Sequence, residues 1–202
     1  SLLKNVTALS TVSGGTLLGV ALAKAISDSK FDYDSFYASM YSAFQPKNDK
    51  ILENAVEKLG KDGVWKENDF KKRSLINAFA LEYNEMDLFS GNFALLNSLE
   101  KENPNDYNLT HVCFNATEFS FGLPFRFQNT GDFSNRALFC KELSPLINDI
   151  QLSDIVASSS CFPLGFEPII FPQEYLKDKK NKKYKELTQK PVFESGVGIM
   201  DG

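Results

Sequence analysis

Ser13 is the residue of this chain whose surroundings best suit a catalytic nucleophile. It lies in the segment Ser-Thr-Val-Ser-Gly-Gly-Thr-Leu-Leu-Gly, between an apolar stretch that ends at Val12 and another that begins at Leu17. A serine in a tight turn between a strand and a helix adopts a sparsely allowed backbone conformation, and this conformation lifts its hydroxyl clear of the backbone. The sequence therefore predicts a nucleophile elbow at Ser13.

Two glycines, Gly14 and Gly15, follow the serine. They carry no side chain that would block a substrate, and their amides lie at the positive end of the predicted helix. We expect these amides to stabilise a negatively charged oxygen. The elbow motif is usually G-x-S-x-G, and here Thr11 replaces its first glycine. Because that glycine lets strand and helix pack closely, Thr11 leaves the tightness of the turn open.

A serine hydroxyl needs a base that removes its proton, and two side chains compete for this role. His111 is the single histidine of the chain, and its place within a predicted strand fits an ordinary sheet histidine better than a catalytic one. Asp201 follows the apolar segment 197–200 and precedes Gly202. An aspartate at a strand end beside a glycine is well placed to meet Ser13. Asp201 is therefore the predicted base, with an ordinary Asp-Gly turn as the alternative.

Strands and helices alternate along the chain in a way that can position these residues. Strands are predicted at 6–12, 109–119, 123–127, 137–140 and 196–200. Helices are predicted at 15–26 and 152–158, and residues 32–99 form a helical section rich in aromatic side chains. We expect an α/β fold in which this section covers one edge of the sheet and contributes to an acyl-chain groove.

Composition limits the function classes that fit the chain. Its 202 residues, 43% of them hydrophobic, suit a single domain with a full core, and the net charge of −4 does not indicate a nucleic-acid partner. Three cysteines, Cys113, Cys140 and Cys161, lack the spacing of a zinc site or a disulfide framework. No transmembrane segment is predicted, which fits a cytoplasmic protein or one peripheral to a membrane.

Four segments, taken in order, resemble the patatin-like phospholipase family. They are Thr11–Thr16, Phe114–Thr117 with Pro124–Phe127, Ala157–Pro168 and Asp201–Gly202. They are similar to the family's elbow, its Asn-Ala-Thr strand, its Ala-Ser-x-x-x-x-Pro segment and its Asp-Gly-Gly/Ala motif. The resemblance implies a three-layer α/β/α fold with a central, mostly parallel sheet. It also implies a Ser-Asp dyad without histidine, in which Ser13 is the nucleophile and Asp201 the base.

The chain departs from the family pattern at two points. The glycine-rich oxyanion loop, G-G-G-x-R/K-G, lies upstream of the elbow in the family and does not occur here. Gly202 is the last residue, so the third residue of the Asp-Gly-Gly/Ala motif is not seen. We therefore expect residues 1–202 to be one acyl hydrolase domain, truncated upstream of that loop and at the Asp-Gly motif. Loss of one oxyanion donor costs roughly 3 kcal/mol of transition-state stabilisation, so the stretch should have low activity.

The expected reaction is acyl-ester hydrolysis of a lipid ester without a metal or cofactor. Ser13 attacks the carbonyl, Asp201 accepts the proton, and the Gly14 and Gly15 amides hold the oxyanion. The lysine-rich segment 177–190 is interpreted as a solvated loop, with contact to an anionic membrane as the alternative. The sequence does not predict an oligomeric state.

Two other function classes compete with hydrolysis. A patatin-like lipid-binding or scaffold domain without catalytic activity is favoured by the departure at Thr11. A nucleotide-binding domain would use Ser13–Thr16 as a phosphate loop. That class is disfavoured because the chain has neither G-x-G-x-x-G nor G-K-S/T.

Overall fold

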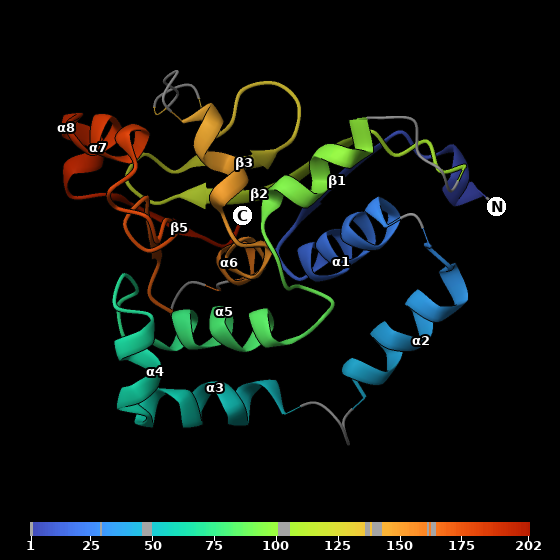
Figure 1. Ribbon diagram of the computed structural model, residues 1–202, viewed down its shortest axis with the longest axis horizontal. Helices are drawn as coiled ribbons and strands as arrows, with labels where there is room; N and C mark the ends of the chain where they lie inside the picture. The colour runs from blue at the N-terminus through green and yellow to red at the C-terminus, as the bar shows by residue number, and fades with distance from the viewer. Residues whose placement is uncertain are drawn as a thin grey trace.

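The computed structural model describes residues 2–28, 30–45, 50–100, 106–135, 138, 143–160, 162 and 165–202. These residues form a mixed α/β structure (Figure 1). The strands are β1 (Ala8–Val12), β2 (His111–Glu118), β3 (Leu123–Gln128), β4 (Ile169–Phe171) and β5 (Val197–Met200). The α-helices are α1 (Gly15–Ser27), α2 (Tyr33–Ala43), α3 (Ile51–Gly60), α4 (Asp62–Glu67), α5 (Leu75–Glu85), α6 (Leu152–Ser159), α7 (Lys182–Thr188) and α8 (Pro191–Glu194). Three 3₁₀ helices are η1 (Leu2–Asn5), η2 (Phe93–Glu100) and η3 (Ser144–Asp149).

Strand β2 is the centre of the sheet, and three strands pair with it. β3 runs antiparallel along one edge of β2. The other edge is shared, because β1 pairs in parallel with its first half while β5 pairs antiparallel with Thr117 and Glu118 near its end. β4 then pairs with the outer edge of β5. As a result, the last residues of β1 and β5 face each other along the same edge of β2.

The expectation of a mostly parallel sheet is wrong for the described strands. Only the β1–β2 pairing is parallel, and the other three pairings are antiparallel. The short connection from β2 to β3 passes through Gly122 at φ +64°, and a connection of this length permits only an antiparallel hairpin. Hydrophobic periodicity predicts that a strand exists, whereas connection length and packing decide its direction. β4 has three residues, too few for a periodic signal, and it was not predicted.

Alternate residues of β2 face the core. Val112, Phe114, Ala116 and Glu118 are buried, whereas His111 is exposed and the residues between them are half-buried. The buried apolar residues of β2 belong to one cluster that also contains residues of α1 and α6. A ring-to-ring aromatic cluster continues this core across β3, β4 and α8, through Phe125, Phe127, Phe133, Phe171, Tyr175 and Phe193. The helices that pack on the sheet therefore cover its buried face.

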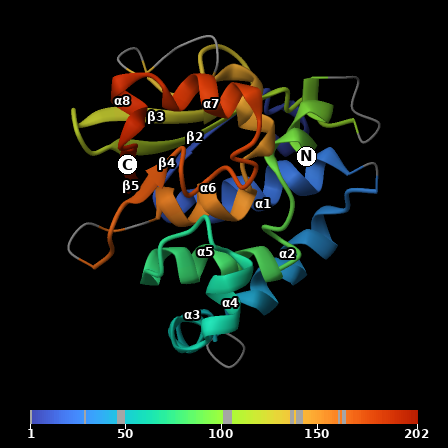
Figure 2. The ribbon, with the colours of Figure 1, turned by 60° about the vertical axis from the view of Figure 1, so that its left-hand side comes forward.

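The described residues of the section 32–99 are largely helical, as predicted. Helices α5, α3 and α4 stack outward from α6, whereas α2 and η2 contact α1. Helix α5 lies between α6 on one side and α3 with α4 on the other (Figure 2). A buried ion pair ties this section to α6, since Lys71 Nζ lies 2.7 Å from Asp154 Oδ1. The section therefore supports the helix that reaches the end of β1.

The lysine-rich segment is not a loop throughout, which corrects the interpretation of 177–190. Residues Lys182–Thr188 form α7, whose Asn181 side chain accepts a hydrogen bond from Lys183 N. Tyr184 and Leu187, one turn apart, are buried in the core. Two apolar residues at helical spacing suffice to anchor a short helix whose other side chains are solvated.

Three sequence features fall largely outside the described residues. Of the predicted strand 137–140, only Leu138 is described, so that strand stays a prediction. Cys140 and Cys161 also lie outside. Among the helices that the structure describes, none combines the length and the apolar character needed to cross a membrane.

Candidate active site

Ser13 forms the turn between β1 and α1, in a conformation that L-residues seldom adopt. Its φ is +54°, in the left-handed region. The carbonyl of Ser13 accepts a hydrogen bond from Thr16 N at 2.9 Å, and this bond closes the turn into the helix. A non-glycine residue in this region costs about 1–3 kcal/mol and persists only where its surroundings enforce it. The predicted elbow is therefore present.

The structure brings Ser13 and Asp201 into contact. Ser13 Oγ donates a hydrogen bond to Asp201 Oδ2 at 3.1 Å. The other carboxylate oxygen, Oδ1, accepts from Gly202 N at 2.8 Å, which fixes the orientation of the carboxylate. Both side chains are half-buried, so the pair is accessible from solvent. This geometry places a base on the proton that the serine must lose.

Gly202 allows Asp201 to approach the elbow closely. A Cβ built on Gly202 would overlap Val12 Cγ2 at the end of β1 and lie 3.3 Å from the carbonyl oxygen of Asn115 on β2. A side chain at position 202 would therefore require Val12 to move, and glycine avoids this overlap. This close approach explains why the Asp-Gly pair follows β5.

Gly19 leaves room for the Thr11 side chain where β1 and α1 pack together at the elbow. A Cβ on Gly19 would lie 2.7 Å from both Cγ2 and Oγ1 of Thr11, whereas a Cβ on Gly15 would meet Thr11 at 4.0 Å, an ordinary contact. The space that the motif usually gains from its first glycine is thus provided by a glycine in the second turn of α1. Strand and helix pack closely although Thr11 carries a side chain.

The glycines that follow Ser13 begin the helix. Gly14 is the N-cap of α1 and Gly15 is its first residue. Both are exposed, and a Cβ on Gly14 would meet no atom within 4 Å. The amides of both glycines therefore belong to the exposed N-terminal end of this 13-residue helix, directly after Ser13, where an anionic oxygen would be stabilised.

His111 lies far from the serine. It is exposed, pairs with Ala8 at the beginning of β1, and contacts Thr110 Oγ1 at 2.8 Å through Nδ1. Ala8 precedes Ser13 by five residues, which corresponds to about 16 Å along a strand. His111 is therefore an ordinary sheet histidine in this fold, and Asp201 is the group that meets Ser13.

A set of buried hydroxyls surrounds the backbone of the elbow, and sequence reasoning missed its role. Ser159, the last residue of α6, contacts Ser13 N, Thr16 Oγ1 and the carbonyl oxygen of Asn115. The predicted Ala-Ser-rich segment 157–163 contains Ser159 but also two further serines. Only the packing of α6 against the elbow distinguishes Ser159 from its neighbours.

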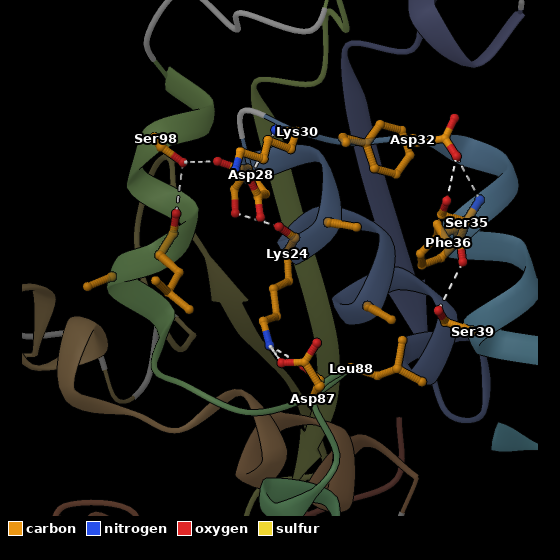
Figure 3. Close-up of a pocket in the computed structure, with 16 residues that line it drawn as sticks. Lys24, Asp28, Lys30, Asp32, Ser35, Phe36, Ser39, Asp87, Leu88 and Ser98 are labelled. Carbon is orange, nitrogen blue, oxygen red and sulfur yellow. Dashed lines mark hydrogen bonds and ion pairs between the residues drawn. The ribbon is translucent and has the colours of Figure 1, made fainter.

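A large open cavity lies along the later turns of α1, away from the dyad. Its volume is about 670 Å³, and α1, α2 and η2 contribute to its wall (Figure 3). Lys24 reaches across it to Ser90 Oγ at 3.0 Å and to the main-chain oxygen of Asp87. Ser13 and Asp201 are not among its lining residues. The predicted role of the helical section in an acyl-chain groove therefore stays a prediction.

The environment of Cys113 favours its protonated thiol over the nucleophilic thiolate. Burial raises the pKa of its thiol, which keeps the thiol protonated, and it is a free cysteine. Within the described part of the chain, no cluster of three or more His, Cys, Asp or Glu side chains is arranged to hold a metal ion. The chemistry that the described residues offer is concentrated at Ser13 and Asp201.

Comparisons with known proteins found no match for this chain. No protein-family model matches the chain. Neither the curated proteins nor the solved structures contain a match.

Proposed function

We propose that this chain is a serine acyl-ester hydrolase of the patatin-like type, with Ser13 as nucleophile and Asp201 as base. One observation carries the proposal: Ser13, at φ +54° in a strand-to-helix turn, donates a hydrogen bond from its hydroxyl to the Asp201 carboxylate at 3.1 Å. The base on its proton activates the serine hydroxyl, and the strained turn exposes that hydroxyl to a substrate.

The reaction proceeds through an acyl-enzyme. Ser13 Oγ attacks the ester carbonyl carbon while its proton passes to Asp201 Oδ2, and the amides of Gly14 and Gly15 stabilise the negative oxygen that forms. Collapse of this tetrahedral intermediate breaks the bond to the alcohol, which leaves with the proton from Asp201. Water then attacks the acyl carbon as Asp201 accepts one of its protons. Collapse of this second tetrahedral intermediate breaks the bond between the acyl carbon and Ser13 Oγ, which takes the proton back from Asp201 as the carboxylic acid leaves.

An apolar ester is the proposed substrate. Exposed apolar side chains flank the nucleophile, with Val12 immediately before it and Leu18 in the first turns of α1. Such side chains favour contact with an acyl chain over contact with a charged molecule. A lipid ester and a peripheral membrane contact fit this environment, and the three-layer α/β/α arrangement of the patatin-like family remains part of the proposal.

Contacts at the elbow argue against both competing function classes, the non-catalytic domain and the phosphate-binding loop. The non-catalytic lipid-binding or scaffold domain was favoured by Thr11, and Gly19 accommodates that side chain. A phosphate loop at Ser13–Thr16 is disfavoured because the Asp201 carboxylate lies against it and would repel a phosphate. These arguments leave hydrolysis as the best-supported class.

Labelling with a fluorophosphonate tests the proposal on the purified 202-residue chain. We expect the reagent to modify Ser13, identified by peptide mass spectrometry, and the chain to release p-nitrophenol from p-nitrophenyl butyrate at a low but measurable rate, because the upstream oxyanion loop is absent from these residues. Ser13→Ala should abolish both. Labelling that persists in Ser13→Ala, or no labelling of the unmodified chain, would refute the nucleophile assignment.

A further inference from the structure

We infer that Ser159 is a positioning residue for the nucleophile, holding the backbone of Ser13 in its strained conformation through a side-chain hydroxyl on another helix. The inference rests on the proposed function of Ser13. Ser159 is fully buried at the end of α6, and its Oγ accepts a hydrogen bond from Ser13 N at 3.1 Å. The two residues are 146 positions apart in the chain, so tertiary packing alone brings them together.

The contacts of Ser159 assign every hydrogen in the network. Ser159 Oγ donates its one hydrogen to the carbonyl oxygen of Asn115 at 2.6 Å, because a carbonyl can only accept. One of its lone pairs accepts from Ser13 N. In the contact with Thr16 Oγ1 at 2.8 Å, Ser159 must therefore be the acceptor and Thr16 the donor.

The same logic extends the network to the residue that departs from the elbow motif. Thr16 has used its hydrogen on Ser159, so in the 3.2 Å contact between Thr11 Oγ1 and Thr16 Oγ1 the hydrogen belongs to Thr11. Asn115 Nδ2 donates to the main-chain oxygen of Thr11 at 2.8 Å. The chain of donors from Thr11 through Thr16 and Ser159 to Asn115 thus links β1, α1, α6 and β2.

This network fixes the direction of the Ser13 amide. A strained residue keeps its conformation only if several neighbours determine it, and Ser159 determines the N–H vector of Ser13 while Thr16 N holds its carbonyl. Those two bonds set where the Cα–Cβ bond points and hence where Oγ meets Asp201. The Ser13 amide is also occupied, which leaves the amides of Gly14 and Gly15 as the oxyanion donors of the elbow.

Ser158 offers a matched control. It is as fully buried as Ser159 and precedes it in α6, but its Oγ donates within its own helix, to Asp154 O at 2.8 Å or Ile155 O at 3.2 Å. Replacement of either serine by alanine removes one buried hydroxyl from the same helix. Only Ser159→Ala removes hydrogen bonds to Ser13 and Thr16 in the elbow.

The experiment compares Ser159→Ala with Ser158→Ala in the full 202-residue chain. For Ser159→Ala we expect the rate of fluorophosphonate labelling at Ser13 and kcat for p-nitrophenyl butyrate to fall roughly 10- to 100-fold with KM nearly unchanged, because misplacement of a reacting group affects the chemical step. Ser158→Ala should stay close to the unmodified chain in both rates. Ser159→Cys, which keeps a weak donor and acceptor of similar size, should give an intermediate rate.

Amide hydrogen exchange at Ser13 gives a readout that needs no hydrolysis. We expect faster exchange of the Ser13 amide in Ser159→Ala than in Ser158→Ala. Equal labelling rates in the two alanine variants, with Ser13 still labelled, would overturn the inference and leave the hydrolase proposal standing. If the unmodified chain is not labelled at all, the hydrolase proposal fails, and equal Ser13 exchange in the two variants would then overturn the positioning role as well.

Discussion

Ser13 and Asp201 follow two strands that run toward each other along the same edge of β2. β1 ends at Val12, which pairs with Asn115, and β5 ends at Met200, which pairs with Thr117. The two strand ends are thus separated by a single position of β2, and the next residue of each meets the other at 3.1 Å. The register of β1 and β5 on β2 therefore brings Ser13 and Asp201 together.

Replacement of the base without a change in size tests its role. We expect Asp201→Asn to lower the hydrolysis rate by about 10²–10⁴-fold, because an amide cannot accept the serine proton in the transition state. The thermal unfolding midpoint should change little, since Asp201 is half-buried and the amide keeps one acceptor oxygen for Gly202 N. Ester hydrolysis and thermal melting measure the two effects.

His111 provides the control for that experiment. His111→Ala should hydrolyse the ester at the unmodified rate, because His111 is exposed at the start of β2, opposite the end of β1 that is remote from Ser13. A large loss in His111→Ala combined with a small loss in Asp201→Asn would reverse the assignment of the base.

The strain at Ser13 predicts that glycine stabilises the elbow relative to alanine. Ser13→Gly and Ser13→Ala both remove the hydroxyl, but only glycine adopts φ +54° without steric cost. We expect Ser13→Gly to be more stable than Ser13→Ala by about 0.5–1 kcal/mol in urea unfolding. At an ordinary helical position the order should be reversed. Ala38→Gly, on the exposed face of α2, should lower the free energy of unfolding by about 1 kcal/mol. Equal stability of the two Ser13 variants would show that the turn carries no strain.

The contact between Thr11 and Gly19 predicts a pair of coupled mutations. Gly19→Ala should destabilise the chain by about 1–3 kcal/mol and slow the labelling of Ser13, because its Cβ would collide with Thr11. Thr11→Gly introduced into the same chain should recover part of this loss, since it removes the side chain that collides. Thermal melting and fluorophosphonate labelling report the two effects.

Gly63 is the matched control for the Gly19 experiment. It lies in α4, and a Cβ built on it would meet no atom within 4 Å, so Gly63→Ala should be neutral or slightly stabilising. If Gly19→Ala behaves like Gly63→Ala, the explanation of how the elbow tolerates Thr11 is wrong.

The buried ion pair between Lys71 and Asp154 predicts a pH-dependent loss of stability. Burial raises the pKa of Asp154 above 3.8, and Lys71 opposes the rise. Lys71→Met removes this opposition, so the native state of the variant holds the proton to a higher pH than the unfolded chain does. The stability of the variant should therefore decline as pH rises above the unfolded pKa of about 4, and its loss relative to the unmodified chain should reach about 3–5 kcal/mol where Asp154 is ionised in both proteins.

Urea unfolding at pH 5 and pH 8 measures this difference, with Lys72→Met as the control. Lys72 pairs with Glu167 on the surface at 2.5 Å, and an exposed pair contributes about 0–1 kcal/mol. We expect Lys72→Met to show no comparable dependence on pH. A constant deficit for Lys71→Met at both pH values would contradict the pKa argument.

The sequence predicted that Ser13 and Asp201 meet, as the structure shows, but it did not predict the strand pairing that brings them together. Ser13 and Asp201 could be identified because each lies at the end of an apolar segment beside glycine, which is a local signal. The direction of β5 could not be predicted, because it depends on how the chain returns to the sheet. Ser159 and Gly19 act only through contacts with the elbow, and no spacing rule connects them to it. Helix α7 was missed because two buried residues among lysines give a weak periodic pattern.

The contact between Ser13 and Asp201 spans 188 positions of the chain. Closing a loop of this length costs chain entropy that the completed sheet must offset, so we expect the contact to form late in folding. If Ser13 reacts as proposed, helical circular dichroism should return before covalent labelling does during renaturation.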